Sequence, residues 1–317
     1  MPRRSSLGVA AIAISLLIPL GIAAPGGAAA SPIGSPTILA TLALSYGQLP
    51  ENIALSAGGS VDVNFNGADE LANISSTGTI TPLGTLPKVP GGGTGTPRLK
   101  MPFSAGIVNN NGAIYSVFST GLASLNGVYL TLPDGTTSRI AALPAGSLAN
   151  GIAENFTTGT LYITDSALGK VWTVSAGGGI PTTWASGKLL EGVKGFGANG
   201  LKLHDGALYV SNTSLGTLVR IPILKNGEAG VAKVVAKNLP SIDDFAFIPG
   251  TNNLIAALNF ANEVAYVHSN GTHSIILTVA NGLENPSAVA ISHSTVYITN
   301  ADYYTLKGPS VMEAPLN

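Results

Sequence analysis

Four side chains with oxygen donors stand at the same point of a recurring sequence pattern, just ahead of a short apolar run. The runs read PENIALS, ANGIAENF, ANGLKLHD and SIDDFAF, and the four residues are Glu51, Asn150, Asn199 and Asp243. Two carboxylates and two amides form an all-oxygen set, which is the ligand chemistry of hard divalent cations. Two carboxylates held close together would repel each other unless a cation or a proton lay between them. These residue types therefore indicate a cation site, provided that the fold brings them together.

The same position recurs at Ala105 and Pro286, which gives intervals of 54, 45, 49, 44 and 43 residues. Each unit continues with a second β-rich run, such as TLYITD, ALYVSN or TVYITN, and with turns rich in glycine and asparagine. Short strands repeating every 40 to 50 residues are typical of a β-propeller with one four-stranded sheet per repeat. Six openings predict six blades.

The last opening leaves too little sequence for four strands before Asn317. The run SPTILATLALSY, residues 35–46, precedes the first opening and reads as a strand. We predict that it pairs with the sixth blade, because this closes the ring and removes two exposed sheet edges. The expected fold class is all-β: a six-bladed propeller with four-stranded blades, closed by an N-terminal strand.

The N-terminal 30 residues have the pattern of a secretory signal peptide. Arg3 and Arg4 precede an apolar run over residues 7–24, and a small-residue site ends at Ala30. A membrane anchor is the alternative interpretation of that run. We expect cleavage after Ala30 and a single propeller domain over residues 31–317, secreted or otherwise extracytoplasmic. The sequence contains no cysteine, which excludes disulfides and thiolate metal sites.

Composition narrows the class of partner. The net charge is −1 with 10% charged residues, and no cluster of lysine and arginine suggests nucleic-acid binding. Neither a G-x-S-x-G nucleophile elbow nor an HExxH zinc motif occurs. We therefore expect a small-molecule substrate, no nucleic acid, no membrane contact after signal cleavage, and a monomer.

In a propeller the innermost strands surround a central channel, so residues of the same repeat phase meet at one mouth of it. Asn-Gly and Asp are also ordinary turn formers, and that is the competing interpretation for each residue taken singly. Glu51 fits it least, because glutamate is a poor turn former. Calcium suits the ligand set, with magnesium or manganese as alternatives; zinc suits it less, since no His or Cys has this phase.

On these motifs the sequence resembles the SMP-30/gluconolactonase family of six-bladed propellers, also called regucalcin-like, over roughly residues 45–305. The match lies in ENIALS, ANGIAENFTTGTLYITDS, GANGLKLHDGALYVSNT and IDDFAFI. The resemblance implies that Glu51, Asn199 and Asp243 ligate a divalent cation. It also implies that Asn150 helps to hold the substrate or a water.

The sequence departs from the family pattern in two places. The usual EGP and PDG openings are ENI and IDD here, so Asp244 stands where a glycine is common. Either Asp243 or Asp244 could face the pore, and the repeat phase favours Asp243. The arginine that some sugar-lactone hydrolases use to grip substrate has no evident counterpart.

Three functions follow. The first is a secreted, metal-dependent hydrolase of a lactone or ester, in which Asp243 takes a proton from water and Asn150 donates a hydrogen bond to substrate. Phe103, Phe196 and Asp244 would line its substrate pocket. The second is a non-hydrolytic enzyme of secondary metabolism, strictosidine-synthase-like or a pericyclic cyclase, that binds a hydrophobic molecule at the pore mouth. The third is a binding propeller without chemistry. A substrate-shaped apolar pocket would favour the second, and a pore mouth plugged by side chains the third.

Overall fold

A computed structural model of the protein describes residues 31–90, 96, 99–193 and 195–317. The predicted signal peptide, residues 1–30, lies outside these residues, so cleavage after Ala30 stays a prediction. Within the described part of the chain, no helix is long and apolar enough to cross a membrane.

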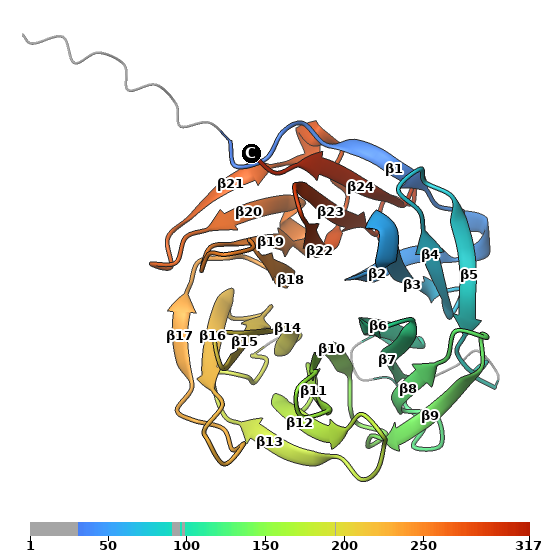
Figure 1. Cartoon of the computed structure of the whole chain (residues 1–317), viewed down its shortest axis with the longest axis vertical. Coiled ribbons are helices and arrows are strands. Elements are labelled where there is room, and N and C mark those ends of the chain that lie inside the picture. The colour runs from blue at the N-terminus through green and yellow to red at the C-terminus, as the bar shows by residue number, and fades with distance from the viewer. Residues whose placement is uncertain (1–30, 91–95, 97–98, 194) are drawn as a thin grey trace, which may run out of the picture. The chain divides into compact units, whose positions relative to one another are not determined.

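Six antiparallel four-stranded sheets stand around a ring, as Figure 1 shows. The first blade consists of β2 (Gln48–Leu55), β3 (Val61–Gly67), β4 (Glu70–Ile74) and β5 (Ile80–Thr85). The second consists of β6 (Phe103–Asn110), β7 (Ala113–Ser119), β8 (Gly127–Thr131) and β9 (Thr137–Ala142). The third consists of β10 (Ala149–Asn155), β11 (Thr160–Asp165), β12 (Lys170–Ser175) and β13 (Thr182–Ser186).

The second half of the ring repeats the arrangement. The fourth blade consists of β14 (Ala198–His204), β15 (Ala207–Asn212), β16 (Thr217–Pro222) and β17 (Lys233–Ala236). The fifth consists of β18 (Ile242–Phe247), β19 (Leu254–Leu258), β20 (Glu263–Val267) and β21 (His273–Leu277). The sixth consists of β22 (Pro286–Ser292), β23 (Thr295–Asn300), β24 (Ser310–Pro315) and β1 (Thr37–Thr41). Among the described residues the helical segments are four short 3-10 turns, η1 (Leu44–Tyr46), η2 (Ala57–Gly59), η3 (Asn259–Ala261) and η4 (Val279–Asn281).

The N-terminal strand closes the ring, as predicted from the sequence. Strand β1 is the outermost strand of the sixth blade and pairs antiparallel with β24, with Thr37 opposite Glu313 and Thr41 opposite Ser310. The two ends of the propeller are thereby joined by a hydrogen-bonded ladder. The expected fold class is confirmed in full.

A break in strand register occurs at the opening of every innermost strand. The breaks fall between Pro50 and Asn52, Ser104 and Ile107, Ala149 and Ile152, Ala198 and Leu201, Ile242 and Phe245, and Pro286 and Ala288. Bulges of this kind re-aim side chains at the end of a strand. Five of the six phased residues lie inside such a break. In the sixth blade the residue inside it is Ser287, one position after Pro286.

The glycine that follows the phased residue in the second, third and fourth blades has a packing role. A Cβ on Gly151 would lie 2.6 Å from the carbonyl oxygen of Asn199, and one on Gly106 would lie 2.4 Å from that of Asn150. Both distances are below any tolerable contact, so the innermost strands of neighbouring blades can approach this closely only without a side chain there. The Asn-Gly pair therefore combines a pore-facing amide with the gap that the next blade needs.

The ring closure generates a stability prediction. Leu42 follows β1 and is buried in the core shared by the first and sixth blades, whereas Ile38 on β1 is 61% exposed. Leu42→Ala should lower the free energy of unfolding by about 2–4 kcal/mol, because it leaves a cavity beside the closing strand. Ile38→Ala should change it by less than about 0.5 kcal/mol. Urea unfolding of the two variants measures the difference, and equal effects would show that the closing strand is not packed in solution.

Candidate functional site

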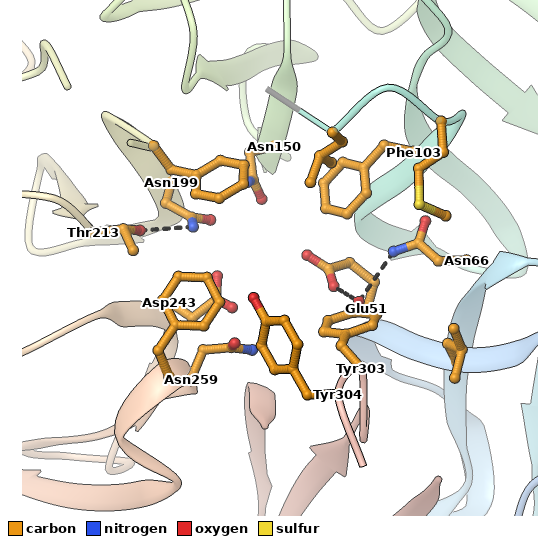
Figure 2. Close-up of a pocket in the computed structure, with 15 residues that line it drawn as sticks. Glu51, Asn66, Phe103, Asn150, Asn199, Thr213, Asp243, Asn259, Tyr303 and Tyr304 are labelled. Carbon is orange, nitrogen blue, oxygen red and sulfur yellow. Dashed lines mark hydrogen bonds between the residues drawn. The ribbon is translucent and has the colours of Figure 1, made fainter. Parts of the chain in front are cut away.

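A cavity of about 290 Å³ opens where the innermost strands begin. It is lined by Leu49, Glu51, Asn66, Leu99, Met101, Phe103, Asn150, Phe196, Asn199, Thr213, Asp243, Asn259, Phe260, Tyr303 and Tyr304. The structure thus brings together six of the seven residues that the sequence nominated, from five blades. Asp244 is not among the lining residues. Figure 2 shows the polar side chains converging on the centre of this cavity.

Glu51 lies in the break between β2 and β3 and is 4% exposed. The Tyr303 hydroxyl donates a hydrogen bond to its Oε2, and Asn66 Nδ2 donates to the Tyr303 oxygen over 3.0 Å. Burial raises the pKa of Glu51 to about 8; the hydrogen bond from Tyr303 opposes this rise, and the negative charge of Asp244 adds to it. Without a cation, Glu51 therefore keeps its proton at neutral pH.

Asp243 lies across the cavity from Glu51 and is 7% exposed. Burial raises its pKa well above the ordinary value, and the negative charges of Glu51 and Asp244 raise it further. The amides of Asn199 and Asn259 lower it in part. Both acids disfavour ionisation in this environment. A cation bound between them would therefore stabilise their ionised forms.

The two phased asparagines are oriented by hydroxyl groups of residues that directly follow the second strand of the same blade. Asn199 Nδ2 donates to Thr213 Oγ1 over 2.8 Å, and that hydroxyl donates to the Ile242 carbonyl over 2.8 Å. Asn150 Nδ2 donates in the same way to Ser166 Oγ over 3.3 Å. The amide nitrogen of Asn199 is thereby engaged, and its buried Oδ1 has no hydrogen-bond partner among the described residues. A buried acceptor without a donor is costly unless a ligand completes it.

Asp244 is turned away from this cavity. Its Oδ2 accepts hydrogen bonds from Lys202 Nζ over 2.6 Å and from Asn52 Nδ2 over 3.1 Å. Lys202 also lines a second opening, formed by the later residues of the innermost strands. The two adjacent aspartates share one register break but serve different groups, so Asp243, and not Asp244, belongs to the candidate site.

The charges around the channel do not balance. Glu51, Asp243 and Asp244 influence one another electrostatically, and Lys202 forms the ion pair with Asp244. Among the described residues neither Glu51 nor Asp243 forms an ion pair. With all three carboxylates ionised, the group would carry a net charge of −2, which one divalent cation would neutralise.

The oxygen donors of the cavity fit a hard cation only if an amide oxygen joins the two carboxylates. The part of the chain that the structure describes contains no group of three or more His, Cys, Asp or Glu side chains that could hold a metal ion. A cation between Glu51 and Asp243 would therefore need an amide oxygen as its third protein ligand. Asn199 Oδ1, buried and without a partner, is such an oxygen.

Several lining residues escaped the sequence analysis. Thr213 and Asn259 directly follow the second strands of their blades, as Ser166 does, so a second phasing on strand ends such as TLYITD would have found them. Tyr303 and Tyr304 lie in the loop between β23 and β24, outside the repeating strands, and no periodic signal marks them. Lys202 follows Asn199 by three positions and carries no distinguishing pattern.

No protein-family model matches the chain. No curated protein matches it either. Among solved structures, a gluconolactonase-family propeller is similar over 90% of this chain and 92% of its own, with 16% identity and a TM-score of 0.64. A catalytically inactive virginiamycin B lyase from Staphylococcus aureus with quinupristin matches over 86% and 82%, with 18% identity and a TM-score of 0.59. Luciferin-regenerating enzyme matches over 88% and 95%, with 11% identity and a TM-score of 0.64. At these identities the likeness shows the fold: this is a six-bladed β-propeller of the architecture that these enzymes share.

The raised pKa of Glu51 generates a pH prediction for metal-stripped protein. A carboxyl with a pKa near 8 in the folded chain and near 4.5 when unfolded stabilises the fold fully below pH 4.5, and this stabilisation is lost as the pH rises to 8. The free energy of unfolding in chelator should fall by about 2–4 kcal/mol more in the parent than in Glu51→Gln between pH 5 and 9. Urea midpoints measure it. A parent curve that falls no more steeply than that of Glu51→Gln, in which Asp243 still titrates, would contradict the account.

The pair of Lys202 and Asp244 generates a second prediction. The Asp244 side chain is 2% exposed, so Lys202→Met leaves a buried carboxylate without its cation and should lower the free energy of unfolding by about 3 kcal/mol. Lys233→Met, at an exposed position on β17, is the matched control and should cost almost nothing. Adding Asp244→Asn to Lys202→Met should restore most of the loss. No recovery in the double variant would show that Lys202 acts through packing alone.

Proposed function

We propose that the protein is a divalent-metal-dependent hydrolase of a lactone or ester. The observation that carries this proposal is the convergence of Glu51, Asp243 and the unpartnered Asn199 Oδ1 on one cavity, where neither acid forms an ion pair with a described residue. Calcium suits an all-oxygen set of this kind, and magnesium or manganese are the alternatives.

Glu51, Asn199 and Asp243 would hold the cation, which when bound supplies Lewis acidity toward a carbonyl oxygen. The chain's own residues supply the proton transfers and the orientation. Asp243 accepts a proton from the water that attacks the carbonyl carbon, and this proton then goes to the alkoxide released when the ester C–O bond breaks. Asn150 uses one amide hydrogen toward Ser166 and has a second one for the substrate. Tyr303, held by Asn66, fixes the carboxylate of Glu51.

The likeness to a gluconolactonase-family propeller supports the choice of a hydrolase. The N-terminal 30 residues support export, so we place the mature enzyme outside the cytoplasm, as a soluble monomer acting on a small molecule. The lack of cysteine is compatible with such a compartment, because stability rests on the strand ladders and core.

A non-hydrolytic enzyme on the same propeller is the second candidate. The observation that favours it is the apolar part of the cavity lining, which includes Leu99, Met101, Phe103 and Phe196. The likeness to virginiamycin B lyase points the same way. A propeller that only serves as a scaffold is less favoured, because the cavity of about 290 Å³ leaves room for a ligand.

A thermal melt with and without metal tests the proposal. The metal-stripped parent should gain about 3–6 °C with calcium at a hundredfold excess over Kd, equivalent to about 2.7 kcal/mol, and hydrolyse lactones or esters only when the metal is present. Asp243→Asn should lose both the shift and the turnover. Glu154→Gln, a buried acid at the second opening, is the matched control and should keep both.

The outcomes separate the candidates. Absence of a shift with calcium, magnesium and manganese would remove the metal-dependent hydrolase. A shift that persists in Asp243→Asn would place the cation elsewhere. Turnover of a substrate in chelator would favour the non-hydrolytic enzyme.

A further inference from the structure

The candidate site has two levels of different chemistry. The floor consists of the buried polar residues Glu51, Asn150, Asn199 and Asp243, whereas the rest of the lining is mainly apolar or aromatic. The exposed Phe260 and Tyr304 form the rim. The apolar and aromatic lining residues are Leu49, Leu99, Met101, Phe103, Phe196, Phe260 and Tyr304. A ligand that fills both levels must have a polar reacting end and an apolar body.

Two aromatic side chains at the rim are exposed to solvent. Phe260, in η3 of the fifth blade, is 49% exposed, and Tyr304, in the loop between β23 and β24 of the sixth blade, is 70% exposed. Their ring centroids are 6.0 Å apart at 51°, although the residues come from different blades. Figure 2 shows Tyr304 extending over the cavity. Exposed aromatic groups gathered at a cavity are a common mark of a site for an apolar ligand.

Side-chain hydrogen bonds anchor the backbone of the two segments that carry these rings. The buried Asp302 precedes the tyrosines and accepts hydrogen bonds from the backbone N–H groups of Lys307 and Gly308, the latter over 2.6 Å, which fold the loop around it. On the other side, Asn262 ends η3 in a left-handed conformation, and its Oδ1 accepts from the Asn285 N–H over 2.7 Å. The backbone of the rim therefore loses little conformational freedom when a ligand binds.

Charge at the site does not favour an anionic ligand. The charged side chains among the described lining residues are Glu51 and Asp243. With the cation of the proposed function and with Lys202 paired to Asp244, the floor is neutral overall. A carboxylate or phosphate on the substrate would therefore gain no ion pair from these residues, and it would lie near floor oxygens that repel it.

We propose that the substrate is a neutral lactone or ester with an aryl ring, seated between Phe260, Tyr304 and the apolar wall, with its carbonyl toward the floor. The reaction of that carbonyl rests on the proposed function. The recognition of the ring rests on the rim alone and can be measured without turnover.

Calorimetry with inert lactams tests the recognition. The probe is γ-phenyl-γ-butyrolactam, and its counterpart carries a dihydroxyethyl group in place of the phenyl ring. The phenyl lactam should bind at least about tenfold more tightly, with or without metal, because its ring leaves water. Phe260→Ala and Tyr304→Ala should each weaken it about five- to tenfold. Phe156→Ala removes a phenylalanine that is 63% exposed at the second opening, and it should leave binding unchanged.

Each result decides the inference. Equal or tighter binding of the dihydroxyethyl lactam, binding of neither lactam, or unchanged binding in both rim variants would overturn it. Hydrolysis of γ-phenyl-γ-butyrolactone in the same protein reports separately on the proposed function. If the phenyl lactam binds through the rim but no cation supports lactone hydrolysis, the substrate class stands and the hydrolase fails. If sugar lactones are hydrolysed in preference, the hydrolase stands and the substrate class fails.

Discussion

The site depends on one constraint: the carboxyl groups of Glu51, Asp243 and Asp244 are buried near the ammonium group of Lys202. A buried charge without a partner costs several kcal/mol, and a carboxylate relieves that cost by holding a proton or by binding a cation. Asp244 forms an ion pair with Lys202. Burial is the main cause of the raised pKa values of Glu51 and Asp243, and a bound divalent cation would favour the ionised form of both.

The propeller architecture brings these buried groups together at one mouth of the channel. Each innermost strand begins with a register break, and in four blades the break directs a polar side chain into the cavity. Glycines such as Gly151 let neighbouring blades approach closely enough for those side chains to meet. The ladder between β1 and β24 then keeps the ring closed and the blades in place around the cavity.

Much of this arrangement could be predicted from the sequence, because the propeller converts repeat phase into spatial proximity. The phasing of Asn150 and Asn199 located four of the polar lining residues without any structure. The repeat phase favoured Asp243 as the residue that faces the pore, but it could not show that Asp244 pairs with Lys202 and does not line the pocket. Tyr303 and Tyr304 could not be found at all, because they lie in a loop that belongs to no repeat, and a loop of that kind is positioned by contacts such as those of Asp302 rather than by periodicity.

A crystal structure of the mature protein with manganese, analysed for anomalous scattering, tests the central claim most directly. The account predicts one strong anomalous peak in the cavity, within about 2.0–2.5 Å of carboxylate oxygens of Glu51 and Asp243 and of Asn199 Oδ1. It also predicts that Lys202 remains paired with Asp244. An empty cavity at a manganese concentration of several millimolar, or a peak ligated by other residues, would contradict the claim that a divalent cation balances the buried carboxylates.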